Sequence, residues 1–208
     1  MRSVSKTVYK FSELDDRAKE RAREWFRVDN LAYDWWEFVY DDAATIASLF
    51  GLDLMTRRVK QMDGKTRYDI NISFSGFCSQ GDGACFEGHY SYAKGSVKKV
   101  KDHAPQDKEL HSIVERLYEA QRKNFYGLQA EIRHTGHYSH KYSMSIDVSC
   151  DDENRRFDED SVIEPLRDFA GWIYERLEAE HDYLMSDEVI DESMETNEYE
   201  FDEDGFPA

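Results

Sequence analysis

Alternating apolar and polar residues define two neighbouring segments of the chain, 70–76 and 84–92. A period of two is typical of a half-buried β-strand, and a short glycine-rich loop separates the two segments. We therefore predict that they are adjacent antiparallel strands joined by that loop. The residues expected in the core of this pair are Ile72, Phe74, Phe86 and Tyr90.

Helical spacing of apolar residues predicts several helices. They are expected over 12–30, 33–50, 96–103, 107–125 and about 161–177. Ser12 is the expected N-cap of the first helix, and Ser161 with Glu164 forms the expected capping box of the last one.

Further alternation predicts strands over 52–61, 128–133 and 142–149, and Tyr142 lies on the same predicted face as Met144. Each predicted strand has one polar face, so the helices are expected to pack on the other face only. The fold class that follows is α+β. It has an antiparallel sheet of about five strands, helices packed on one face and an acidic C-terminal tail.

Charge is distributed unevenly. The formal net charge is −17, and residues 186–208 contain ten acidic residues and no basic ones. We therefore predict a single α+β domain over 1–185 and an acidic C-terminal extension over 186–208. Two interpretations of the extension stay open: a disordered solubilising end, or a short helix near 187–197 that packs back on the body or on a partner.

This charge balance also bears on partners. Net acidity disfavours direct binding to nucleic-acid phosphates and is compatible with a protein partner that has a basic surface. No segment has the apolar length needed to cross a bilayer, and the first ten residues lack the apolar run of a secretory signal. Three cysteines without metal-type spacing indicate reduced thiols, so we expect a cytoplasmic protein without membrane association.

The glycine-rich loop is the first candidate for a binding site. Loops that a rigid sheet holds in place often carry binding residues, and glycines let the backbone approach another group closely. The loop residues expected to bind are Ser79, Gln80, Gly81, Asp82 and Gly83.

A turn rich in histidine is the second candidate. His134, His137 and His140 are spaced by three between two predicted strands, with Tyr138 among them. A three-histidine metal site is one interpretation, and an exposed polar turn is the other, which we favour. We expect no metal and no cofactor. The residues of this turn expected to bind are His134, His137 and Tyr138, and we expect His89 to lie near both candidates.

Two patterns permit a catalytic interpretation. His89 and His137 each begin an H-x-S triplet, a pattern that resembles the paired signature of two-histidine phosphoesterases. Alternatively, Cys85 lies on the same predicted outward face as His89 and could act as a nucleophile with it as base. An inert packing cysteine is the more ordinary interpretation, so no catalytic residue is predicted.

One expectation concerns the geometry of these candidates. Both turns join neighbouring antiparallel strands, so we predict that the glycine-rich loop and the 134–140 turn lie at the same end of the sheet. They would then form one exposed polar and aromatic surface.

Several stretches resemble a family of small bacterial and phage-borne proteins, often labelled antitoxin of a toxin–antitoxin stability system. The similarity extends from about Phe11 to Gly205. It rests on the stretches YDWWEFVYDDA, SGFCSQGDGACFEGHYSY, HAPQDKELH, HTGHYSH and NEYEFDEDG. The resemblance implies a mobile-element or phage context.

These observations lead to two hypotheses about function. We expect a non-enzymatic cytosolic protein that neutralises or modulates a partner protein, as an antitoxin or a phage counter-defence factor does. The alternative is a protein that binds a small ligand or nucleotide, or an enzyme that acts on phosphodiesters, using the glycine-rich loop and the histidine turn.

Overall fold

Two compact units make up the protein. The computed structural model describes residues 7–29, 34–60, 64–152 and 154–208. A terminal unit combines Met1–Trp36 with Glu178–Ala208, and a central unit comprises Glu37–Leu177. This division differs from the predicted domain over 1–185 with an extension over 186–208, because the tail supplies core residues to the N-terminal helix.

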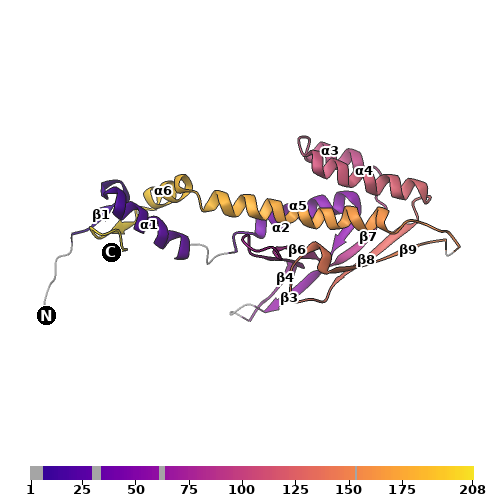
Figure 1. Ribbon diagram of the computed structural model, residues 1–208, viewed down its shortest axis with the longest axis horizontal. Coiled ribbons are helices and arrows are strands. Elements are labelled where there is room, and N and C mark those ends of the chain that lie inside the picture. The colour runs from indigo at the N-terminus through magenta and orange to yellow at the C-terminus, as the bar shows by residue number, and fades with distance from the viewer. Residues whose placement is uncertain (1–6, 30–33, 61–63, 153) are drawn as a thin grey trace. The chain divides into compact units, whose positions relative to one another are not determined.

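The central unit is built on a four-stranded antiparallel sheet in the order β2-β7-β8-β9 (Figure 1). Its strands are β2 (Leu52–Leu54), β7 (Gly88–Ser91), β8 (Leu128–His134) and β9 (Met144–Cys150). Burial alternates along them: Ala130 and Ile132 are buried, whereas Asp147 on the neighbouring strand is exposed. One face of the sheet is therefore core, and the other is polar and open to solvent.

The helices of the central unit lie on the apolar face of this sheet (Figure 1). They are α2 (Glu37–Phe50), α3 (Ser96–His103), α4 (Lys108–Lys123) and the part of α5 (Asp160–Leu184) up to Leu177. The ring of Phe169 on α5 lies 5.0 Å from the Phe50 ring and 5.8 Å from the Phe86 ring, both edge-on. The mixed α and β architecture predicted from the sequence is confirmed. Among the described residues, no helix combines the length and apolar character needed to cross a bilayer.

Three arms, each a pair of antiparallel strands, meet at one junction in the central unit. Besides β2–β7, the arms are β3 (Thr56–Lys60) with β4 (Thr66–Ile70), and β5 (Ile72–Ser75) with β6 (Gly83–Phe86). The backbone N–H of Met55 donates to Glu87 (2.8 Å), that of Asn71 to Met55 (2.7 Å) and that of Glu87 to Asn71 (3.2 Å). This closed ring of hydrogen bonds satisfies the backbone where the predicted long strands change partner.

The predicted pairing around the glycine-rich loop is confirmed. Ile72 lies opposite Phe86 and Phe74 lies opposite Ala84 in an antiparallel register. Ile72, Phe86 and Tyr90 are buried as expected, and Phe74 is half-buried. The long strand predicted over 84–92 is divided at Glu87, and its second half, β7, pairs with β2 and β8 instead.

The terminal unit joins both ends of the described chain. Strand β1 (Tyr9–Lys10) pairs antiparallel with β10 (Glu200–Phe201), next to η1 (Phe11–Glu13), α1 (Asp16–Asp29) and α6 (Asp187–Thr196). Its buried core consists of Phe11, Leu14, Ala18, Ala22, Ile190, Met194 and Phe201. Of the two interpretations of the acidic tail, packing against other residues is therefore the one the structure supports.

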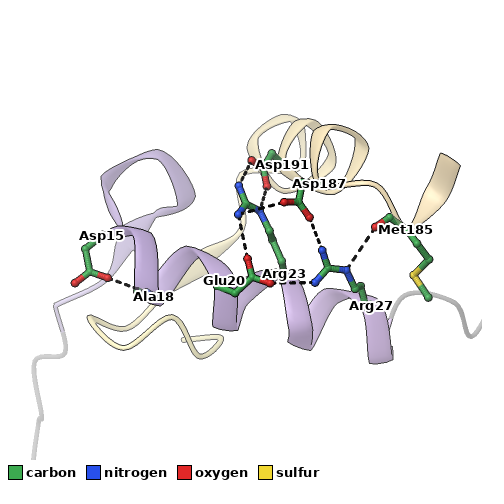
Figure 2. Close-up of polar contacts among 8 residues, drawn as sticks. All are labelled: Asp15, Ala18, Glu20, Arg23, Arg27, Met185, Asp187 and Asp191. Carbon is green, nitrogen blue, oxygen red and sulfur yellow. Dashed lines mark hydrogen bonds and ion pairs between the residues drawn. The ribbon is translucent and has the colours of Figure 1, made fainter. Parts of the chain in front are cut away.

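Arginines of α1 hold the acidic tail by ion pairs (Figure 2). The guanidinium of Arg23 donates to both carboxylate oxygens of Asp191, from Nε at 2.7 Å and from Nη2 at 2.6 Å. Arg27 pairs with Asp187 and, at 3.4 Å, with Glu20. Hydrogen bonding to Asp191 raises the pKa of Arg23 above its ordinary value. Two hydrogen bonds between one guanidinium and one carboxylate fix the orientation of α6 on α1, in addition to the attraction between the opposite charges.

The caps of two helices differ from those predicted. Asp15 caps α1, because its carboxylate accepts the N–H of Ala18 at 2.8 Å, and the predicted cap Ser12 lies in η1 (Figure 2). Ser161 lies inside the first turn of α5, where its hydroxyl donates to the carbonyl of Asp158. The ends predicted at Asn30 and Tyr33 lie outside the described residues.

Candidate functional site

The glycine-rich loop over 76–82 is ordered by one of its own side chains. The carboxylate of Asp82 accepts the N–H groups of Cys78 (3.0 Å) and Ser79 (2.7 Å), and the carbonyl of Ser79 accepts the N–H of Asp82 (3.0 Å). Two charge-assisted hydrogen bonds preorganise the loop. Asp82 therefore shapes the loop, whereas Ser79, Gln80 and Gly81 are exposed and available to a ligand.

The base of the loop is fixed to α5. The hydroxyl of Tyr174 donates to the carbonyl of Gly76 at 3.0 Å. The ring of Phe77 lies 5.5 Å from the Tyr174 ring and is stacked on Phe74 at 5.7 Å. The exposed tip thus projects from a base that the helix and the sheet both hold.

The histidine turn packs directly against the strand ends that flank this loop. The hydroxyl of Ser75 donates to the carbonyl of Ser139 at 3.2 Å. Gly83 is buried, and a Cβ atom on it would lie 2.8 Å from Cδ2 and 3.1 Å from Cα of His140. The two candidate segments therefore lie side by side, as the sequence predicts. Glycine is required at position 83 because the turn approaches its backbone so closely.

This close approach gives a direct test. Gly83→Ala should lower the free energy of unfolding by about 1–3 kcal/mol, because the added methyl displaces the backbone of the turn at His140. Urea unfolding would measure the change. Gly81→Ala is the matched control, because nothing lies within 4 Å of a Cβ there. Equal effects of the two substitutions would contradict the packing described.

Backbone contacts occupy the rings of two turn histidines. Nε2 of His134 lies 2.9 Å from the carbonyl oxygen of Tyr138, and Nδ1 of His140 accepts the N–H of Tyr142 at 3.2 Å. His137 and Tyr138 are exposed, and Tyr138 retains 76% of its accessible surface. Among the described residues, no group of three or more His, Cys, Asp or Glu side chains is placed to hold a metal ion.

His89 does not lie with the loop and the turn, contrary to expectation. It lies opposite Glu131 on β8, and its Nδ1 is 2.8 Å from a carboxylate oxygen of that residue. The end of β8 at His134 is three positions further along, or about 10 Å at the usual rise per residue. The reason is the junction at Glu87, which directs β6 toward the turn and β7 into the larger sheet. The two H-x-S triplets therefore do not converge.

Cys85 lies in the core, contrary to the predicted outward position. It is 1% exposed, and burial raises the pKa of its thiol, which opposes formation of the nucleophilic thiolate. The residue before it, Ala84, faces the core, and the segment around Ser139 and His140 covers the other side of β6. The turn thus covers a face that alternation alone marks as exposed.

Two residues that were not predicted as site residues, Tyr142 and Arg167, lie beside the histidine turn. Tyr142 was predicted to face inward with Met144, but a 3-10 turn over Lys141–Ser143 precedes β9 and leaves Tyr142 61% exposed. Its ring lies beside the guanidinium of Arg167 on α5. No sequence pattern predicts the outward position of Tyr142, because apolar and polar residues continue to alternate through the 3-10 turn.

The chain belongs to the DUF8835 family. A family model described as domain of unknown function DUF8835 matches residues 35–187, which is well over half the chain. The match includes the whole central unit, and it excludes β1, α1 and almost all of α6. No curated protein and no solved structure matches the chain.

Proposed function

We propose that the protein binds a partner protein through the surface formed by the glycine-rich loop and the histidine turn. One observation carries the proposal: the loop is held at its base by Tyr174 and internally by Asp82, yet its tip and Tyr138 remain exposed. A preorganised surface loses little conformational entropy on binding, and exposed tyrosines are common in protein interfaces. In this proposal the protein acts in the cytosol and is not an enzyme.

The likeness of the sequence to proteins labelled as antitoxins supports a more specific proposal. The partner would then be a toxin, or a defence protein that a phage-borne factor neutralises. The alternative is binding of a small ligand or nucleotide, or hydrolysis of a phosphodiester. The separation of His89 from the turn and the burial of Cys85 weigh against the catalytic form of that alternative.

Substitution at the tip of the loop tests the proposal. Gly81→Val should abolish capture of the partner from the native host and leave the melting temperature nearly unchanged. The position tolerates a side chain, because nothing lies within 4 Å of a Cβ there and Gly81 is not among the glycines with positive φ. Reconstitution with the purified partner, identified by mass spectrometry, would measure the loss.

Ser149→Val is the control for this substitution. It adds apolar volume at an exposed position of β9, five residues from the turn end of the strand at Met144. Its binding should match that of the unmodified protein. Retained binding by Gly81→Val would refute the proposed surface. A rise in melting temperature with a nucleotide, lost in Gly81→Val, would favour the ligand-binding alternative.

A further inference from the structure

The β3–β4 arm is basic in an otherwise acidic chain. Its two strands, Thr56–Lys60 and Thr66–Ile70, contain four basic residues and one acidic residue, whereas the formal net charge of the whole chain is −17. The arm extends from the junction on the side of the central unit away from α3 and α4 (Figure 1). Its surface charge therefore differs in sign from that of the chain as a whole.

One face of the arm presents two cations and an aromatic ring. Arg58 lies opposite Tyr68 in the antiparallel register, and Lys60, two positions along the strand, shares the face of Arg58. Arg58 and Lys60 are exposed, and Tyr68 retains 67% of its accessible surface. Arg58 donates from Nη2 to the hydroxyl of Thr66 at 3.3 Å, and among the described residues neither Arg58 nor Lys60 forms an ion pair. Both positive charges are therefore available to a ligand.

The opposite face of the arm turns toward α2 and has balanced charges. It carries Arg57, Arg67 and Asp69. Arg67 pairs there with Asp69 at 2.5 Å and with Glu37 of α2 at 2.7 Å. The acidic residue of the two strands is thus paired on this face, and the exposed face holds an excess of positive charge.

The negative charge of the rest of the chain does not cancel this local excess. Exposed charges that are further apart than about 8 Å are largely screened at physiological ionic strength. Residues 186–208, which hold ten of the acidic residues, belong to the terminal unit. The net charge of the chain therefore slows the approach of a polyanion, whereas its binding at the arm depends on the side chains within a few ångströms.

We propose that Arg58, Lys60 and Tyr68 bind single-stranded nucleic acid, an activity additional to the proposed binding of a partner protein. Proteins that bind single strands combine basic side chains along the phosphates with aromatic rings on which bases stack. Arg58 and Lys60 lie about 7 Å apart along the strand, which is comparable to the spacing of successive phosphates. Bases inside a duplex are already stacked on each other, so the exposed ring of Tyr68 favours a single strand. A carboxylate-rich protein segment would use the two cations and leave this ring without a role.

Fluorescence anisotropy of a labelled oligothymidine, titrated with the full chain, tests the proposal. The dissociation constant should be about 1–100 µM at about 50 mM salt. Arg58→Gln/Lys60→Gln should weaken binding at least about tenfold and reduce the slope of log affinity against log salt by about 0.7 for each charge removed. Tyr68→Ala should weaken binding about tenfold with little change in that slope, and Tyr68→Phe should bind as the unmodified protein does.

Matched variants separate the arm from general effects of charge and exposed aromatic residues. Lys98→Gln/Lys99→Gln removes the same charge from exposed positions of α3, and Tyr138→Ala removes an exposed tyrosine of the histidine turn. Both should bind the oligothymidine as the unmodified protein does. The melting temperature of every variant should remain nearly unchanged, because all the replaced side chains are exposed.

Several results would overturn the inference. They are no binding at about 0.1 mM protein and about 50 mM salt, binding of a duplex or of polyglutamate that is as tight, or equal losses in the two double variants. Retained binding by Arg58→Gln/Lys60→Gln would overturn it as well. The inference and the proposed function fail independently, because Gly81→Val alters the loop and leaves the side chains of the arm in place.

Discussion

Phe86→Ala should destabilise the central unit by about 3–5 kcal/mol. The side chain is 1% exposed, lies opposite Ile72 and meets the Phe169 ring of α5 edge-on at 5.8 Å. Truncation removes apolar burial and leaves a cavity where the β5–β6 arm meets a helix. Urea unfolding monitored by circular dichroism would measure the loss.

Phe38→Ala is the matched control, because it makes the same change at a residue of α2 that is 54% exposed. Its effect should remain within about 0.5 kcal/mol, as for most surface substitutions. A loss below about 1 kcal/mol in Phe86→Ala would mean that the arm contributes little to the core.

Phe201→Ala should unfold the terminal unit and leave the central sheet protected. Phe201 is fully buried, and its ring lies 6.4 Å from Phe11 and 6.1 Å from Trp25. The expected cost is again about 3–5 kcal/mol. The buried cluster described in this unit comprises seven residues, so the unit has little stability to lose. Hydrogen exchange should show lost protection over α1 and α6 but not over β8.

Phe206→Ala provides the comparison for the terminal unit. Phe206 is 55% exposed and contacts the Arg21 guanidinium at 5.9 Å, so its loss should be small. If Phe201→Ala leaves protection of α1 unchanged, the tail is a dispensable solubilising end, and the packing described for it is refuted.

Local spacing was sufficient to predict the helices and the main strand pair. Helix α3 has the predicted bounds, 96–103, because Val100 faces the core and Pro105 follows soon after. The Ile72–Phe86 pairing was predictable because alternation and a short loop fix a hairpin locally. Helix caps were less predictable, since Ser12 and Asp15 are both good caps and tertiary packing decides between them.

Alternation could not reveal which polar face another segment covers. Cys85 was placed outward because its neighbours face the core, but the turn at Ser139 and His140 covers that side. The separation of His89 from the turn depends on the backbone ring of Met55, Asn71 and Glu87, which brings together residues far apart in sequence. No local pattern encodes such a junction.

Only part of the candidate site could be predicted, because its remaining contacts also join segments that are far apart in the sequence. The meeting of the loop and the turn follows from two neighbouring hairpins and is seen at Gly83 and His140. Asp82 is predicted to contact a ligand, and the structure gives it a further role that no sequence pattern indicates, because its carboxylate orders the loop. The contribution of Arg167 depends on how α5 packs beside the turn, which the sequence does not specify.

The pairing of the two ends of the chain has a consequence during synthesis. Arg21 on α1 is bonded to Asp204, 183 residues later. At ordinary translation rates, roughly ten to forty seconds separate the emergence of these two residues from the ribosome. Throughout that interval the apolar face of α1 lacks its partner strand and helix. A nascent chain released before β10 would retain this exposed face, which a chaperone or protease could recognise as the mark of an incomplete molecule.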